Sequence, residues 1–196
     1  MEGNIKVEEI YNNLLQSVSY LVTIENKLIV VDCGDSEKMI KAIGINREPA
    51  IILLTHCHQD HVYGLTKLLD RYPNASVYCS LPTLEGLKDE QLNLSYIIPE
   101  YPIIFTQEKH VNLIQEGVQY IKNIQIEVLS TPGHSDDCMS YIIGDCIFTG
   151  DSYIPFAKVF TKWPRSSKML AVKSEEMIVS LINKRQLNVY CGHWKS

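Results

Sequence analysis

The sequence predicts a mixed α/β fold, and three observations support this expectation. In the first half, short apolar β-rich runs alternate with segments that carry helix start and stop signals, which is typical of layered α/β proteins. In the second half, a series of β-rich runs predicts another sheet. A length of 196 residues with 45% hydrophobic content suits one domain over residues 1–196 with a substantial core.

The first half is expected to contain five strands and three helices. Two of the strands form a hairpin around the turn at 25–27. The expected strands are 4–8, 18–24, 28–32, 51–54 and 75–79, and the expected helices are 36–43 with Ser36 as N-cap, 60–71, and 81–90. Residues 91–109 are expected to form either an irregular lid or a connection with packed aromatic side chains.

The second half is expected to form its own sheet, followed by one helix and a last strand. Gly144-Asp145 fits a hairpin turn. The helix is expected from Ser174, as N-cap, to Arg185, with acidic residues in its first turn and basic residues in its last. The expected strands are 111–114, 117–121, 124–129, 139–143, 146–149 and 187–191.

The densest group of metal-ligand residues follows an apolar strand and comprises His56, His58, Asp60 and His61. Because alternate side chains of an extended chain share a face, His56 and His58 can reach one point while Cys57 points away. The chain then turns and directs Asp60 and His61 to a second position. Imidazole and carboxylate suit zinc, iron or manganese, so two adjacent metal sites are expected. The alternative, in which Asp60 only caps a helix, leaves many crowded polar groups without a shared partner.

Three further stretches place a ligand residue after a strand and a small-residue turn. In each, a glycine permits a tight bend before the ligand. The stretches are Thr131-Pro132-Gly133-His134, Thr149-Gly150-Asp151 and Cys191-Gly192-His193. Of the six histidines only His110 lies outside these motifs, and it is interpreted as a surface residue.

This ordered set of motifs resembles the metallo-β-lactamase fold superfamily, most closely its glyoxalase II-like hydrolase branch, along nearly the whole chain. The resemblance implies a four-layer αββα sandwich with two metals at the edge of the two sheets. The implied ligands are His56, His58 and His134 for one metal, Asp60, His61 and His193 for the other, and Asp151 for both. Asp32 matches a family aspartate that supports the ligands from behind.

This sequence differs from both the β-lactamases and glyoxalase II, and these differences limit which activities the resemblance implies. β-Lactamases of this fold commonly carry a cysteine in place of Asp151 and are exported, which argues against β-lactam hydrolysis. Glyoxalase II has a Gly-His pair where this chain has Asp137 and Cys138. It also has a C-terminal helical region that helps to hold glutathione, whereas this chain stops three residues after His193. The metal site is therefore expected to carry over, and the glutathione site is not.

The leading hypothesis is a metal-dependent hydrolase with two divalent ions, zinc first and iron or manganese as alternatives. A hydroxide bridging ions about 3.5–4 Å apart would attack an ester, thioester or lactone-type small molecule. Asp60 and Asp151 are the candidate catalytic residues, which would orient the water or pass on its proton. The alternatives are a mononuclear-iron persulfide dioxygenase-like oxidoreductase, a two-metal phosphodiesterase, and a non-catalytic metal-stabilised module.

Substrate specificity is expected to come from residues 153–165. Lys162 and Arg165 suit an anionic substrate, and the aromatic residues suit contact with its body. The candidates are Tyr153, Lys162, Trp163 and Arg165, with Phe156 as a further one. The alternative is an exposed loop whose aromatic side chains simply pack.

The amino-acid composition limits the expected binding partners and the expected cellular location. The net charge is -5, and lysine and arginine form no runs, which argues against nucleic acid. No signal peptide or membrane-spanning stretch is evident, so no membrane contact and a cytoplasmic location are expected. The six cysteines include no Cys-x-x-Cys pair and are expected to be reduced and mostly buried.

Overall fold

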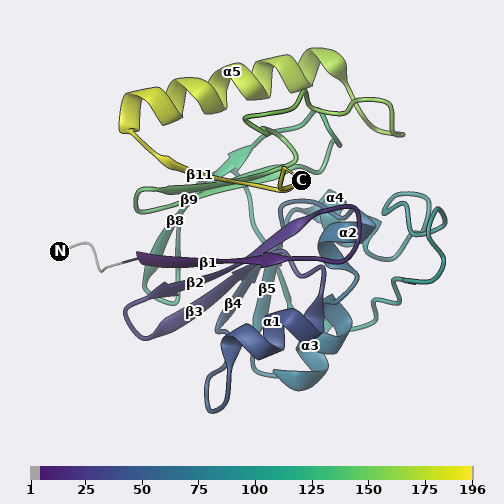
Figure 1. The fold of residues 1–196 in the computed structure, drawn as a ribbon, viewed down its shortest axis with the longest axis vertical. Helices are drawn as coiled ribbons and strands as arrows, with labels where there is room; N and C mark the ends of the chain where they lie inside the picture. The colour runs from purple at the N-terminus through teal and green to yellow at the C-terminus, as the bar shows by residue number, and fades with distance from the viewer. Residues whose placement is uncertain (1–4, 196) are drawn as a thin grey trace.

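The computed structural model describes residues 5–195, which form two β-sheets packed face to face (Figure 1). The first sheet runs in the order β1 (Ile5–Tyr11), β2 (Val18–Ile24), β3 (Lys27–Val31), β4 (Ile51–Leu53), β5 (Ser76–Cys79) and β6 (Val111–Leu113). The second runs in the order β11 (Asn188–Cys191), β10 (Cys146–Gly150), β9 (Met139–Ile143), β8 (Ile124–Ser130) and β7 (Gly117–Ile121).

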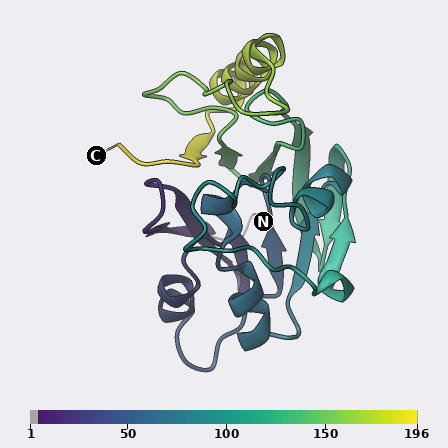
Figure 2. The same ribbon diagram turned by 90° about the vertical axis from the view of Figure 1, so that its right-hand side faces the viewer.

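Helices cover the outer face of each sheet. In Figure 1, α1 (Ser36–Ile43) and α3 (Leu65–Arg71) lie below the first sheet, and α5 (Lys168–Arg185) lies above the second. Figure 2 shows α5 nearly end-on above the second sheet. The layers are therefore helix, sheet, sheet and helix, which confirms the predicted αββα arrangement.

Alternating side chains of the strands build separate cores on both sides of the first sheet. In β2, Tyr20 and Val22 pack between the two sheets, whereas Leu21 packs toward the helices. In β4, Ile51 faces the second sheet and Ile52 faces the helices. Such strands are buried on both faces, and for this reason their sequences are continuous runs of apolar residues. A third cluster lies between the second sheet and α5.

Strand direction brings the ends of five strands to one edge of the sandwich. Strands β3 and β4 are parallel, so the residues that follow them share an edge of the first sheet. In the second sheet, β8 and β10 are both antiparallel to β9, and β11 is parallel to β10. The two edges are joined by hydrogen bonds, including Met139 N–H to Thr55 O at 2.8 Å and Val18 N–H to Gly192 O at 2.7 Å.

The prediction of one continuous helix over 60–71 is wrong, because this segment forms two short helices. It divides into α2 (Gln59–Val62) and α3, separated at Tyr63-Gly64. The break occurs because Gly64 packs against the turn after β3, where its N–H donates to Cys33 O at 3.0 Å. A Cβ on Gly64 would lie 2.6 Å from Gly34 O. His58 occupies the N-cap position of α2, so Asp60 lies in the first turn and does not cap it.

Two predicted N-caps are wrong. Asp35 rather than Ser36 caps α1, since its carboxylate accepts from the two N–H groups of Glu37 and Lys38. Helix α5 begins six residues earlier than predicted, with Ser167 as N-cap. Ser174 lies inside this helix, and its hydroxyl donates to Pro132 O at 2.7 Å.

The middle of the chain also differs from the prediction. Helix α4 (Leu81–Gly86) ends earlier than expected. Strand β6 pairs with β5 and so extends the first sheet, not the second. Residues 91–109 have little regular structure before a short 3-10 helix at Glu108–His110.

The N-terminal strand was predicted over 4–8. Residue 4 lies outside the described residues, and the observed strand β1 covers Ile5–Tyr11.

The cysteines are all free thiols, as predicted, and only Cys191 is not fully buried. No helix within residues 5–195 is long and apolar enough to cross a membrane. His110, predicted at the surface, is half-buried, and its Nδ1 lies 3.2 Å from Ala75 O.

Gly133 tests how tightly α5 packs on the turn before His134. Its φ is +149°, and an added Cβ would lie 2.3 Å from the Cα of Ala171 in α5. We expect Gly133→Ala to lower the free energy of unfolding by about 2–4 kcal/mol, because overpacking adds to backbone strain. Urea denaturation measures this loss. Gly117→Ala is the control, because Gly117 has φ +122° but open space around its Cβ position. Equal losses in both variants would contradict the packing explanation.

Candidate metal centre

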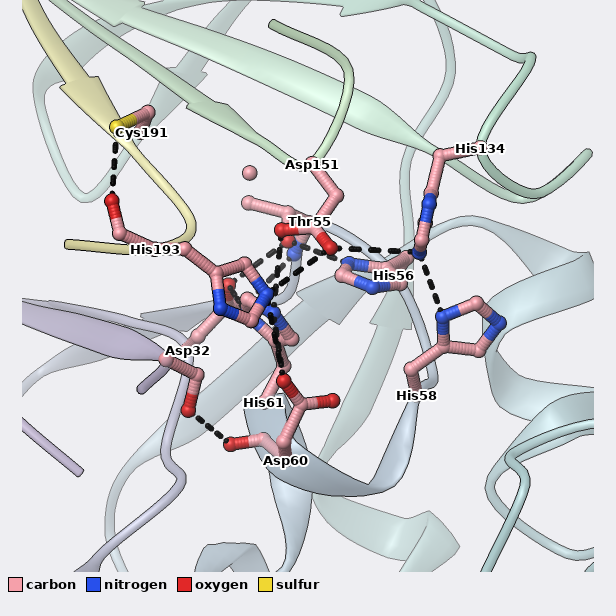
Figure 3. A network of polar contacts seen from close by, with 12 residues as sticks. Asp32, Thr55, His56, His58, Asp60, His61, His134, Asp151, Cys191 and His193 are labelled. Atoms are coloured by element: carbon pink, nitrogen blue, oxygen red, sulfur yellow. Dashed lines mark hydrogen bonds and ion pairs between the residues drawn. The ribbon is translucent and has the colours of Figure 1, made fainter. Parts of the chain in front are cut away.

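Polar side chains from five loops converge at the common edge of the two sheets. Figure 3 shows them pointing toward one another from both sheets. They are buried, apart from the half-buried His193. The set comprises Asp32 after β3, His56, His58, Asp60 and His61 after β4, His134 after β8, Asp151 after β10, and His193 after β11.

Six of these residues make up two of the groups of three that could hold a metal ion. Within each group, ligand atoms lie within 4.8 Å of one another. In the first group, His58 Nδ1 lies 2.8 Å from His134 Nε2. In the second, Asp60 Oδ2 lies 3.4 Å from His61 Nε2 and 3.5 Å from His193 Nε2. The first group is His56, His58 and His134, and the second is Asp60, His61 and His193.

Asp151 lies between the two groups. One carboxylate oxygen, Oδ2, is 3.3 Å from His134 Nε2 and 3.2 Å from His193 Nε2. The other, Oδ1, is 3.3 Å from His61 Nε2. A single carboxylate therefore reaches donors of both groups, which is the arrangement that a shared ligand requires.

Backbone carbonyls fix two of the histidine rings. His134 Nδ1 lies 2.9 Å from Phe160 O, and His193 Nδ1 lies 2.9 Å from Leu15 O. A carbonyl oxygen can only accept, so each Nδ1 carries the proton and each Nε2 presents its lone pair to the centre.

Asp32 supports both groups from behind. Its Oδ2 accepts from the Thr55 hydroxyl at 2.7 Å and faces His61 Nδ1 at 3.0 Å, while its Oδ1 accepts from Thr55 N–H at 2.8 Å. The same Thr55 hydroxyl lies 2.9 Å from His56 Nδ1. One carboxylate thus orients His61 directly and His56 through Thr55, and such support tunes metal ligands.

Asp137 was not identified as a site residue from the sequence. Its Oδ2 accepts from Cys57 N–H at 2.8 Å and from the Thr83 hydroxyl at 3.1 Å, and the side chain is buried. It therefore holds the backbone between His56 and His58. The only sequence signal was the acidic pair Asp136-Asp137, two and three residues after His134.

The unsatisfied atoms of the centre fit a cation. Among the described residues, His56 Nε2, His61 Nε2 and Asp151 Oδ1 are buried without a hydrogen-bond partner. Unpaired buried polar atoms are costly, and imidazole nitrogen and carboxylate oxygen are metal donors. The arrangement therefore suits divalent ions held by the two groups.

The environment favours the ligand forms of His56 and Asp151. Burial lowers the pKa of His56 well below its usual range, and nearby histidines add to this, so the ring is neutral. Burial raises the pKa of Asp151, but His193, His61 and His134 outweigh that effect and bring the pKa well below its usual range. Asp151 is therefore ionised.

Gly192 provides space for the ligands. The chain bends at this glycine, as expected, although its φ is not in the left-handed region, unlike that of Gly133 or Gly150. A Cβ on Gly192 would lie 2.1 Å from Asp151 Oδ1 and 2.9 Å from His61 Cε1. The absence of a side chain therefore lets the end of β11 approach the ligands.

A cavity of about 290 Å³ opens over the ligands. Of the four predicted substrate-binding residues, Trp163 lines it. Tyr153 packs against the cluster under α5. Lys162 is exposed and is not a lining residue, and Arg165 forms an ion pair with Asp136 at 2.6 Å.

Most of the apolar residues that line the cavity were not identified from the sequence as substrate-binding candidates. Leu94, Ile97 and Ile98 belong to the segment predicted as a lid or a connection, while Leu15 and Phe160 come from two other loops. Gln59 also lines the cavity. The available signal was a set of large apolar residues in segments without strand or helix periodicity.

Comparison with known proteins agrees with this architecture. A model of the metallo-beta-lactamase superfamily matches residues 12–193. A hydroxyacylglutathione hydrolase of Xylella fastidiosa is 29% identical over 176 residues, which are 88% of this chain and 57% of that protein. This chain spans about half the length of the curated relatives it matches.

Two solved structures share the fold. The B3 metallo-beta-lactamase BLEG-1 has a TM-score of 0.81 at 25% identity, with 97% of this chain and 92% of that chain covered. The protein TTHA1623, crystallised in a di-iron-bound form, has a TM-score of 0.80 at 24% identity, with 96% and 92% covered.

Asp32 offers a test of ligand support. Asp32→Ala leaves two buried N–H groups and one hydroxyl without an acceptor, at about 1–3 kcal/mol each. We expect a lower free energy of unfolding and a zinc affinity reduced by about 10–100-fold. Urea denaturation and competition with a chromophoric chelator measure these two effects.

Asp35→Ala is the matched control for Asp32→Ala. Asp35 is also buried, but its carboxylate caps α1 and contacts none of the candidate ligands. We expect it to lose about 1 kcal/mol of stability and to keep its zinc affinity. An Asp32→Ala protein with unchanged zinc affinity would disprove the support by Asp32.

Proposed function

The chain belongs to the metallo-beta-lactamase superfamily, as its motifs predicted, and on that basis we propose that it is a metal-dependent hydrolase. The observation that carries the proposal is Asp151 lying between two groups of three donors beside a cavity. Structural zinc sites are usually closed and four-coordinate, so a larger donor set next to a cavity favours catalysis.

The ligand assignment follows the two groups. His56, His58 and His134 would hold the first ion, Asp60, His61 and His193 would hold the second, and Asp151 would serve both. Zinc is the first choice, and iron or manganese suits the same donors. When bound, two such ions act as Lewis acids and lower the pKa of water to about 7, so that a hydroxide nucleophile forms at neutral pH.

The chain's own residues supply orientation and proton transfer. Asp60 and Asp151 both line the cavity, so their carboxylates are placed to orient an attacking water and to accept its proton. The substrate we propose is a small molecule with an ester, thioester or lactone carbonyl. The name of the Xylella fastidiosa relative, a hydroxyacylglutathione hydrolase, supports a thioester among these.

Two other activities fit the site less well. A mononuclear-iron persulfide dioxygenase leaves Asp60, His61 and His193 without a role. A phosphodiesterase would use the same two-metal chemistry, but none of the described residues that line the cavity is a lysine or arginine that could pair with a phosphate. The fold neighbour BLEG-1 is named a B3 metallo-beta-lactamase, so a β-lactam belongs in the substrate screen.

Metal content tests the ligand assignment. We expect two divalent ions per natively purified chain, measured by elemental mass spectrometry. The double variant His58→Ala/His134→Ala removes two of three donors of the first group, so it should hold at most one ion and lose turnover. His110→Ala removes the histidine outside the site and should keep both ions. One iron per wild-type chain would instead favour the oxidoreductase.

Metal removal should destabilise the protein. Ions at about 1,000 times their dissociation constant contribute about 4 kcal/mol each. In a chain of this size 1 kcal/mol shifts Tm by about 2–4 °C, so chelation is expected to lower Tm by at least about 8 °C. Differential scanning calorimetry with and without chelator measures the shift. An unchanged Tm, with loss of metal verified, would contradict the role of ions in satisfying the buried donors.

A further inference from the structure

The cavity over the candidate metal centre has a polar floor and an apolar wall. The floor consists of candidate ligands, including His58, Asp60 and Asp151. The wall consists of Leu15, Leu94, Ile97, Ile98, Phe160 and Trp163. No lysine or arginine lines the cavity within the described part of the chain. We propose that the wall binds an uncharged, apolar acyl or aryl group of the substrate while the floor faces its carbonyl.

This inference rests on the proposed hydrolase function and specifies its substrate class. Several wall residues leave apolar surface in water, since Leu15 is 58% exposed, Phe160 46% and Ile97 41%. Large apolar side chains gathered around a concave site indicate ligand binding, whereas scattered ones do not. Covering a methylene group is worth about fourfold in affinity, so an apolar substrate group gains directly from this wall.

The cations that were expected to bind an anionic substrate are not available to the cavity. The Arg165 guanidinium is paired with Asp136 at 2.6 Å, and Lys162 is outside the lining. The described residues of the wall therefore offer no lysine or arginine to a carboxylate at the far end of an acyl group, while the ions proposed on the floor would face the reacting carbonyl. Burying such a charge unpaired against the wall is costly.

The wall is tied to the ligands through the backbone. Phe160 O accepts from His134 Nδ1, and Leu15 O accepts from His193 Nδ1, each at 2.9 Å. The same two residues turn their side chains to the cavity. The apolar group of a substrate is thus held at a defined place relative to the ligands. Truncating either side chain keeps the carbonyl that orients the histidine.

The size of the cavity limits the substrate. About 290 Å³ lies at the low end of ligand sites, which span about 300–1,000 Å³. It suits an acyl chain of a few carbons or a single ring, together with the reacting carbonyl. We therefore expect small acyl thioesters, esters or lactones and not large conjugates.

Matched thioesters test the substrate class. The metal-loaded protein is assayed with N-acetylcysteamine thioesters, whose thiol is neutral, carrying an acetyl, hexanoyl or succinyl group. We expect kcat/KM for hexanoyl to exceed that for acetyl and for succinyl by at least about tenfold. Leu15→Ala and Phe160→Ala should each lower the ratio of hexanoyl to acetyl kcat/KM by about tenfold.

Phe156→Ala is the control for Phe160→Ala. Both side chains are 46% exposed, but Phe156 does not line the cavity. It should leave the ratio of hexanoyl to acetyl turnover unchanged. Equal turnover of all three thioesters, or a preference for succinyl, would overturn the inference and leave the hydrolase standing.

A binding measurement separates the inference from the activity. The chain has two tryptophans, so in a Trp194→Phe background the fluorescence of Trp163 reports entry into the cavity. Hexanamide should quench it saturably, and the anion succinamate should bind at least tenfold more weakly. Quenching without hydrolysis of any hexanoyl thioester, hexanoyl ester or lactone would support the apolar site and reject the proposed hydrolase. Absence of hexanamide binding would overturn the inference.

Discussion

Burial of carboxylates and imidazoles at the joined edges of the two sheets is the constraint to which the surrounding structure responds. Each group leaves water and needs a partner, and several of their atoms have none among the described residues. Asp151 and Asp32 distribute the contacts, with Asp151 reaching both donor groups and Asp32 orienting rings from behind. Such a set is stable when cations take up the remaining donor atoms.

The scaffold positions these groups through strand direction. Five strands end at one edge, and each delivers its ligand within a few residues, so the ligands stand on rigid elements. Loops that do not carry ligands then dock on those that do. Ser166 Oγ donates to His134 O at 2.6 Å, and Ser167 N–H donates to Gly133 O at 2.8 Å. The segment that carries Phe160 and Trp163 is thereby fixed beside the centre.

Different parts of the chain supply the candidate metal ligands and the residues that would contact the substrate. The ligand motifs follow directly after strands of the two sheets, whereas the cavity wall comes from irregular loops. A fold of this kind supports several reactions, so its donor groups indicate the type of chemistry and its loops determine what enters. In this chain the loops contribute aliphatic and aromatic side chains, and the neighbouring cation Arg165 is used to hold a turn.

The sequence by itself determined the strands and the candidate ligands, because both are encoded locally. Strands 18–24, 117–121 and 139–143 have the predicted bounds, since apolar residues and turn signals define them directly. The candidate ligands follow strands within short turns, so they could be recognised in the sequence, and the resemblance to the superfamily implied how they are grouped. Only the tertiary structure decided the break at Gly64, the sheet to which β6 belongs, the pairing of Arg165 and the apolar wall. These depend on close approach between segments far apart in the chain, and no local pattern of residues records which segments will meet.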